Sequence, residues 1–172
     1  MHTIYVASAV LTSRLSSHRQ TIQLTERIAK AAKSGVYPVE WLATGKPVFT
    51  AGGRFLSVSH TGGRLYVAVS GCPLGMDAEL RREVPERVRR EWMTPEEQKQ
   101  DFFAVWTAKE AVAKLDGRGL SILKKIHVYD TMASIGSRFI ALRREERDGA
   151  VITFAAADPS KVIWVDDPAE QG

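Results

Sequence analysis

The chain has 172 residues, of which 44% are hydrophobic, and this is enough for one domain or for two small halves that share a core. A single cysteine, Cys72, cannot form an internal disulfide, and neither a secretory signal nor an apolar run of about 18 residues is present, so we expect a cytoplasmic protein with no membrane partner. The net charge of +4 favours anionic partners without separating nucleic acid, an acidic protein and a phosphorylated small molecule.

The first half of the chain predicts an edge strand, a helix and a hairpin. Residues 3–9 read as the edge strand, and residues 36–50 as a connection. Residues 17–33 form the helix, with Gly35 as its stop and an approximate apolar stripe of Ile22, Leu24, Ile28, Ala29 and Ala32. Residues 55–59 and 64–70, the second of which alternates between apolar faces, predict two paired strands with residues 60–63 as the turn between them.

The middle of the chain predicts a third strand and three helices. Residues 74–80 continue the hairpin as a meander, and residues 85–92 form a short basic helix. Thr94-Pro95-Glu96-Glu97 begins the next helix, because it combines a capping threonine, proline at the first helical position and glutamate three residues after the cap. The longer helix covers residues 101–115 and ends at Gly117, with a buried stripe of Phe102, Val105, Trp106, Val112 and Ala113.

Lys109 projects near the middle of that buried stripe, so its ammonium needs an anionic partner. The remaining chain predicts strands of a second sheet region over residues 122–129, 137–144, 151–156 and 162–165, followed by a frayed tail. Strand, helix and further strands thus occur both before and after residue 75. This weak repetition is consistent with one domain over residues 1–172 that has similar halves at 1–73 and 74–165 packed face to face and a tail at 166–172.

Three carboxylates and one ammonium occur at spacings that favour a common site. Asp77 and Glu79 lie two residues apart in a strand, so both leave the same face. Glu110 and Lys114 are neighbours on a helix at i,i+4. If the helix crosses the strand, the carboxylates repel one another unless a cation lies between them. Oxygen-only ligation favours Mg²⁺, which substrate phosphates usually complete, so the substrate carries phosphate.

The remaining parts of a phosphate-ester reaction are also present. Glu110, or a water on it, can accept a proton, and Lys114 can lie against a phosphate. His60, just before a Thr-Gly-Gly turn, can bind phosphate through its ring and the nearby backbone amides, and Lys46 adds a further cation.

Each feature also has an ordinary structural explanation. The pair of Asp77 and Glu79 alone is more often solvated surface or a salt bridge, and Glu110 with Lys114 is usually a helix-stabilising ion pair. His60 alone more often caps a turn, and Trp106 belongs first to the core. The occurrence of all the segments in one chain, in this order, is what favours a site.

The segments resemble those of the 4′-phosphopantetheinyl transferases of the surfactin-synthetase type. The resemblance covers roughly residues 45–129. It rests on Ser57-Val-Ser59-His60, Gly75-Met-Asp77-Ala-Glu79 and Trp106-Thr-Ala-Lys109-Glu110-Ala-Val-Ala-Lys114, with Gly45-Lys46-Pro47 and Gly117-Arg-Gly119-Leu120 also matching.

The resemblance implies a fold of two pseudo-symmetric α+β halves with the site in the cleft between them. It implies a holo-[acyl-carrier-protein] synthase type of reaction, in which the phosphopantetheine arm of coenzyme A passes to a serine of an apo acyl or peptidyl carrier protein. The reaction needs Mg²⁺ and releases adenosine 3′,5′-bisphosphate.

By the same resemblance, Asp77, Glu79 and Glu110 are metal ligands. Glu110 also acts as the base, and Lys114 is catalytic and contacts the diphosphate. The nucleotide site is lined by Lys46, Pro47, Ser59 and His60. The order of the motifs favours a monomer with a site completed by one chain.

The half before Gly45 is short for this family, which leaves Arg14, His18 and Arg19 as unranked candidates to bind the 3′-phosphate. The arginines between Arg81 and Arg90 are candidates to dock an acidic carrier protein, although a solvated basic helix explains them equally well. Two other functions stay open. One is a non-catalytic protein of the same fold that binds coenzyme A or a carrier. The other is a nucleic-acid module, which the absence of interleaved aromatics and binding motifs disfavours.

Overall fold

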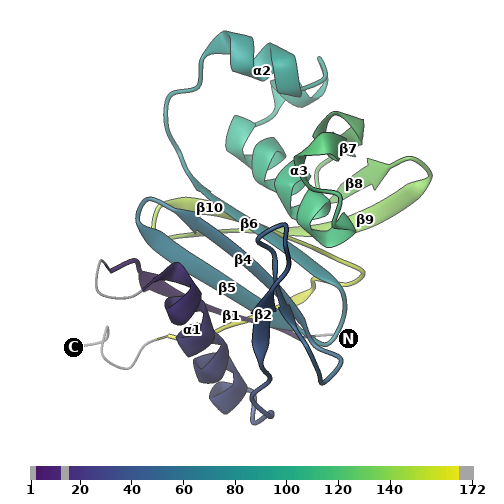
Figure 1. The fold of residues 1–172 in the computed structure, drawn as a ribbon. Coiled ribbons are helices and arrows are strands. Elements are labelled where there is room, and N and C mark those ends of the chain that lie inside the picture. Colours follow the sequence, from purple (N-terminus) through teal and green to yellow (C-terminus); the bar gives the residue numbers. More distant parts are fainter. Residues whose placement is uncertain (1–2, 13–15, 167–172) are drawn as a thin grey trace. The chain divides into compact units, whose positions relative to one another are not determined.

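The computed structural model describes residues 3–12 and 16–166, and it divides into two compact units (Figure 1). Unit 1 runs up to Pro73 and takes in the segment from Ser160 onward, whereas unit 2 is Leu74–Pro159. Each unit combines helix with sheet, which confirms the α+β class. Within the described ranges, the helices lack the length and apolar character that crossing a bilayer requires.

The sheet of unit 1 has four strands in the order β11-β1-β5-β4. β1 (Thr3–Val10) pairs antiparallel with β5 (Arg64–Ser70) and parallel with β11 (Lys161–Trp164). The prediction of an edge strand at residues 3–9 is therefore wrong. The placement of residues 162–165 in a second sheet region is also wrong, because β11 finds its partner at the opposite end of the sequence. The predicted hairpin is confirmed, since β4 (Phe55–Thr61) pairs antiparallel with β5.

Helix α1 (Ser17–Ala31) covers one face of this sheet, and Leu24 and Ile28 belong to the hydrophobic cluster of unit 1. The Ser16 side chain accepts a hydrogen bond from the backbone N–H of Arg19 and caps the helix. Ile22 is 37% exposed and lies outside the buried stripe assigned to it. The helix also ends before Gly35, because Lys33 already takes a positive φ of 50°.

Residues 36–50, expected to be a connection, contain a small antiparallel ribbon. β2 (Val39–Trp41) pairs with β3 (Pro47–Phe49), with Trp41 opposite Pro47. The backbone N–H of Leu42 donates to the carbonyl of Lys46 at 2.9 Å and closes the turn. Strands of three residues are too short for alternation to show in the sequence.

The sheet of unit 2 is antiparallel throughout, in the order β6-β10-β9-β8-β7. Its strands are β6 (Leu74–Leu80), β7 (Ile126–Val128), β8 (Met132–Ile135), β9 (Arg138–Arg147) and β10 (Ala150–Ala156). β6 has the predicted bounds, but the predicted meander is wrong because β6 pairs with β10 and not with β5. Local pattern sets where a strand begins and ends, whereas the choice of partner is made by packing far along the chain.

Helix α3 (Phe102–Asp116) packs on this sheet through a cluster that includes Val105, Val112, Leu142 and Val151. It follows α2 (Glu86–Trp92) and a single 3-10 turn, η1 (Glu97–Lys99), and a second 3-10 segment, η2 (Gly119–Lys125), follows it.

The capping box predicted at Thr94 forms. The Glu97 carboxylate accepts from the N–H of Thr94 at 2.9 Å, and the Thr94 hydroxyl accepts from the N–H of Glu97 at 3.3 Å. It starts only one turn, because Gln100 returns to extended backbone.

One feature of the strand pairing occurs in both units. In unit 1 the first strand, β1, is followed by α1 and pairs antiparallel with β5, which pairs with β4. In unit 2 the first strand, β6, is followed by α2, η1 and α3 and pairs antiparallel with β10, which pairs with β9. In each unit the second strand of the last hairpin therefore pairs with the first strand of that unit.

Candidate functional site

Helix α3 meets β6 at Gly75. A Cβ added at Gly75 would lie 1.9 Å from the carbonyl oxygen of Ala111 and 2.7 Å from the backbone nitrogen of Leu115. Only a residue without a side chain permits this approach. Asp77 and Glu79 follow at intervals of two, so they leave the strand on the face where Gly75 touches the helix.

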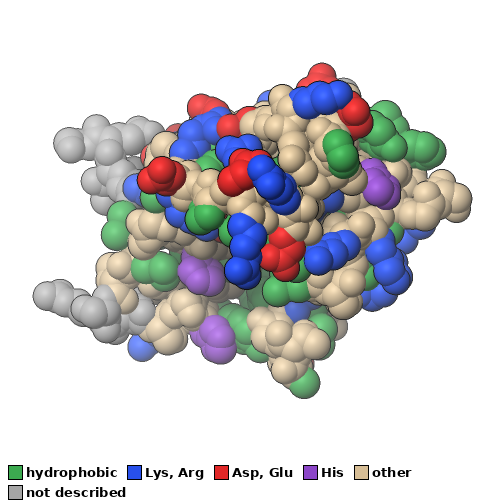
Figure 2. Space-filling view, turned by 90° about the horizontal axis from the view of Figure 1, so that it is seen from above, with side chains coloured by type: hydrophobic (Ala, Val, Ile, Leu, Met, Phe, Trp, Pro, Cys, Tyr) green, Lys and Arg blue, Asp and Glu red, His purple; other side chains and the backbone are tan. Residues whose placement is uncertain are grey.

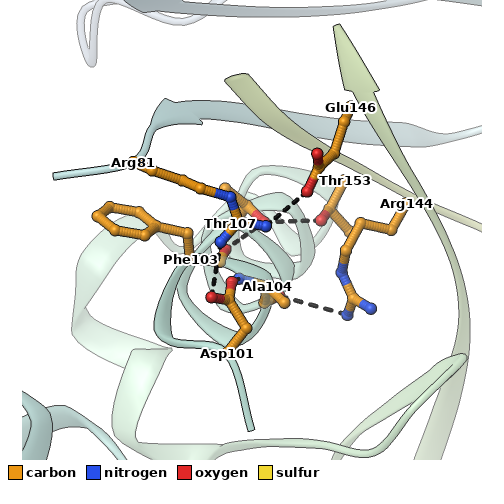
Figure 3. Close-up of polar contacts among 8 residues, drawn as sticks. All are labelled: Arg81, Asp101, Phe103, Ala104, Thr107, Arg144, Glu146 and Thr153. Carbon is orange, nitrogen blue, oxygen red and sulfur yellow. Dashed lines mark hydrogen bonds and ion pairs between the residues drawn. The ribbon is translucent and has the colours of Figure 1, made fainter. Parts of the chain in front are cut away.

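A pair of threonines shows the same orientation independently (Figure 3). Thr107 on α3 and Thr153 on β10 lie 2.7 Å apart between their hydroxyl oxygens. Thr153 is the cross-strand partner of Asp77, and directly paired residues project from the same face of a sheet. Asp77 therefore faces α3.

The N-terminus of α3 is tied to the end of β6. The Asp101 carboxylate accepts from the backbone N–H of Ala104 at 2.8 Å and caps the helix. Its other oxygen lies 2.6 Å from the guanidinium of Arg81, which also reaches the Glu146 carboxylate at 2.5 Å (Figure 3). These groups are exposed, so their stabilising effect is small, about 0–1 kcal/mol for each pair. They fix a direct link between the strand that carries Glu79 and the helix that carries Glu110.

The structure brings the four charged residues predicted in unit 2 together at this contact. The Lys114 ammonium lies 2.8 Å from the Asp77 carboxylate. Asp77 is only 6% exposed, whereas Lys114 is 30% exposed. Glu79 accepts from the Arg82 guanidinium at 2.8 Å. Arg82 was considered at the level of sequence only as part of the basic cluster.

The neighbouring carboxylates affect the pKa of Glu110. Burial, followed by the negative charges of Asp77 and Glu79, raises the pKa of Glu110 from 4.5 to about 7, against the opposing effect of the Lys114 ammonium. A pKa near 7 is suited to proton transfer at neutral pH. The direction of these effects shows that the three carboxylates lie close enough to repel one another.

The donor chemistry of this cluster fits a hard divalent cation, since all three groups are carboxylates. As the side chains stand, the described part of the chain contains no three Asp, Glu, His or Cys side chains arranged around one metal position. The physical reason is that Asp77 turns toward Lys114 and Glu79 toward Arg82. A metal ion ligated by Asp77 and Glu79 would compete with these two ion pairs.

Lys109 has the anionic partner that its position in the core demands. Its ammonium lies 2.9 Å from the Glu97 carboxylate and donates to the carbonyl of Ile126 at 2.6 Å. The two side chains are 1% and 3% exposed. Glu97 also accepts from the backbone N–H of Val128 at 2.8 Å, so the pair joins α3, η1 and β7. The sequence marked Glu97 only as a capping residue.

The other predicted residues belong to unit 1. Lys46 and Pro47 lie together at the turn of the β2–β3 ribbon, and Ser59 and His60 are adjacent on β4, which contacts β3. Ser59 is buried and His60 is exposed.

The three candidates for the 3′-phosphate have different positions. Arg14 lies outside the described residues. The Arg19 backbone takes part in the cap of α1. His18 stacks on Trp41, with ring centroids 4.2 Å apart and an interplanar angle of 22°, and Trp41 is the strand partner of Pro47. Within unit 1, His18 therefore lies against the ribbon that carries Lys46. Trp41 was not recognised from the sequence, because a lone tryptophan in a connection gives no periodic signal.

Residues 73–155 match the family model of the 4′-phosphopantetheinyl transferase superfamily. The match begins just before β6, ends within β10 and includes Asp77, Glu79, Glu110 and Lys114. No curated protein matches the chain. The stretch of unit 2 that holds the charged cluster is thus similar to proteins that transfer 4′-phosphopantetheinyl groups.

Proposed function

We propose that the chain is a Mg²⁺-dependent 4′-phosphopantetheinyl transferase of the surfactin-synthetase type. It transfers the arm of coenzyme A to a serine hydroxyl of an apo acyl or peptidyl carrier protein and releases adenosine 3′,5′-bisphosphate. The observation that carries the proposal is the cluster at the contact of β6 and α3, where Lys114 lies 2.8 Å from Asp77 beside Glu110. This cluster lies inside the stretch that matches the superfamily.

The residues of unit 2 divide the chemistry among them. Glu110, with a pKa of about 7, accepts the proton of the serine hydroxyl directly or through a water. The serine oxygen forms a bond to the phosphorus next to the pantetheine arm as the bond to the bridging diphosphate oxygen breaks. Lys114 lies against the diphosphate and stabilises the charge that develops on the departing oxygen.

Asp77, Glu79 and Glu110 would hold the Mg²⁺ ion, which when bound neutralises negative charge on the diphosphate. The buried position of Asp77 and the close approach at Gly75 support this assignment, because they hold the backbone of β6 against that of α3. The carboxylates can then change partners by side-chain rotation alone.

We assign the nucleotide part of coenzyme A to the residues of unit 1, namely Lys46, Pro47, Ser59 and His60. The stack of His18 on Trp41 supports adding His18, because it brings a nitrogen-bearing ring to the same ribbon as Lys46. Among the candidates for the 3′-phosphate we therefore favour His18.

An acidic carrier protein remains our proposed partner, with a narrower docking surface than the sequence indicated. Five arginines and three glutamates between Arg81 and Trp92 leave a net charge of only +2. Arg81, Arg82 and Arg90 each bind a carboxylate of this chain, and Arg89 lies 5.3 Å from the ring centroid of Phe102. Figure 2, which looks down from above on the view of Figure 1, shows basic and acidic side chains interspersed on that face. Arg87 on the exposed side of α2 is the residue we expect to meet the carrier.

The test is mass spectrometry of a panel of apo carrier proteins after incubation with the purified chain, Mg²⁺ and coenzyme A. We expect one or more carriers to gain the mass of the arm, and Glu110→Ala to abolish the gain. Glu83→Ala, which removes an exposed carboxylate of the same unit, should leave it intact. Binding of coenzyme A by calorimetry without modification of any carrier would favour the non-catalytic alternative.

A further inference from the structure

Each carboxylate of β6 already has a cation of this chain beside it. Lys114 reaches Asp77 from α3, and Arg82 reaches Glu79 from the residues just after β6, both at 2.8 Å. The two cations differ in setting. Lys114 meets a carboxylate that is 6% exposed, whereas Arg82, itself 59% exposed, meets one that is 23% exposed.

The backbone beneath these pairs leaves little room for adjustment. Gly75 holds β6 so close to α3 that a single Cβ would collide with the carbonyl of Ala111. The hydroxyl contact between Thr107 and Thr153 holds the same helix against the neighbouring strand. An ion that enters the cluster therefore displaces side chains, and those of Lys114 and Arg82, which are 30% and 59% exposed, can rotate without a shift of the backbone.

We propose that Lys114 and Arg82 are resident counter-cations that compete with the divalent ion, so that the substrate-free protein binds metal weakly and a bound diphosphate, by drawing Lys114 from Asp77, strengthens metal binding. This inference rests on the proposed function. It adds a coupling between the two ligands, which resides in one lysine and one arginine of this chain.

Charge balance supports the coupling. Among the five side chains Asp77, Glu79, Glu110, Lys114 and Arg82, ionisation of all three carboxylates leaves one net negative charge, which is a poor match for a divalent ion. Departure of Lys114 alone leaves two negative charges, which balance the ion. A bound diphosphate provides a second anion with which the Lys114 ammonium can form an ion pair after it leaves Asp77. By thermodynamic linkage, the metal must strengthen diphosphate binding by the same factor.

The test uses Mn²⁺, an oxygen-ligated ion whose free and bound forms are distinguished by electron paramagnetic resonance. Lys114→Met should bind Mn²⁺ about tenfold more tightly than the wild type in the absence of substrate, since the cation paired with the nearly buried Asp77 carboxylate is removed. Arg82→Met, at an exposed pair, should bind about twofold more tightly. Lys125→Met removes an exposed lysine of the same unit and should leave the affinity unchanged. Inorganic pyrophosphate should tighten Mn²⁺ binding to the wild type. The difference in Mn²⁺ affinity between the wild type and Lys114→Met should then be much smaller.

The outcomes separate this inference from the proposed function. One outcome supports the metal site but refutes the role of Lys114 and Arg82 as counter-cations. In that outcome, Asp77→Asn loses Mn²⁺ binding, whereas Lys114→Met and Arg82→Met bind Mn²⁺ no more tightly than the wild type. No Mn²⁺ binding by the wild type or by either variant, or binding that survives in Asp77→Asn, overturns the metal site and this inference with it. Circular dichroism checks that Lys114→Met is folded, and Arg82→Met tests the proposal at a position where the fold is not at risk.

Discussion

Replacement of Glu110 by glutamine should change how the stability of the metal-free protein depends on pH. Burial, together with Asp77 and Glu79, raises the pKa of Glu110 from 4.5 to about 7. Each pKa unit corresponds to about 1.4 kcal/mol, so ionising Glu110 in the folded protein costs about 3 kcal/mol. Because the side chain is only half-buried and water screens part of this effect, we expect about 2 kcal/mol.

The direction in which stability changes with pH follows from proton linkage. The folded protein holds the Glu110 proton more tightly than the unfolded chain, so protonation stabilises the fold. This stabilisation is complete below the unfolded pKa of 4.5, decreases as the pH rises through the interval, and is lost above the folded pKa of about 7. The glutamine variant has no such group, so its stability relative to the wild type should rise over the same interval.

The assay is urea unfolding with a chelator present, measured at several values between about pH 5 and about pH 8. The free energy of unfolding of Glu110→Gln, relative to the wild type, should increase by about 2 kcal/mol from the lowest pH to the highest. Glu83→Gln, which replaces an exposed carboxylate of the same unit, is the matched control for the substitution itself. A difference that is flat with pH, or that runs the other way, would refute the account of three carboxylates in mutual repulsion.

Four further changes probe other parts of the structure. Lys109→Met leaves Glu97 buried without its ammonium and should lower the free energy of unfolding by about 3–5 kcal/mol, whereas the double variant with Glu97→Gln should recover part of this loss, as urea unfolding would show. His18→Ala should weaken coenzyme A binding about threefold in calorimetry, with no effect from His127→Ala in unit 2. Arg87→Glu should raise the KM for the carrier and leave the KM for coenzyme A unchanged, in steady-state kinetics. Gly75→Ala should lower the free energy of unfolding by about 1–3 kcal/mol, and Gly71→Ala, which has open space around it, should not.

Local pattern predicted much of the fold. Alternation located β5 to the residue, and the apolar period with its glycine stop located α3 to within one residue at each end. The partners of the strands could not be read in this way. β6 pairs with β10 and β11 with β1, over separations that leave no mark in a short window of sequence.

The candidate site likewise has features that the sequence predicts and contacts that it does not predict. The spacing of Asp77 with Glu79, and of Glu110 with Lys114, predicted which groups share a face, because each pair lies within one strand or one turn of helix. Other contacts hold α3 on the sheet and so bring the pair on β6 next to the pair on α3. The residues that make these contacts have no distinctive spacing in the sequence. Thr107 and Thr153 are 46 positions apart in the chain, and their contact depends on how α3 lies on β10.

Gly75 explains why those two local spacings become one cluster. A strand presents alternate residues to the helix that covers it, so the positions that follow Gly75 on that face are those of Asp77 and Glu79. Any side chain at Gly75 would hold α3 away by the width of at least one carbon atom, and Lys114 could then no longer lie 2.8 Å from Asp77 without bending its stem. The glycine thus sets the distance between the carboxylates of β6 and the charged flank of α3. This distance determines both how strongly Glu110 resists ionisation and how firmly Lys114 holds the place that a divalent ion would take.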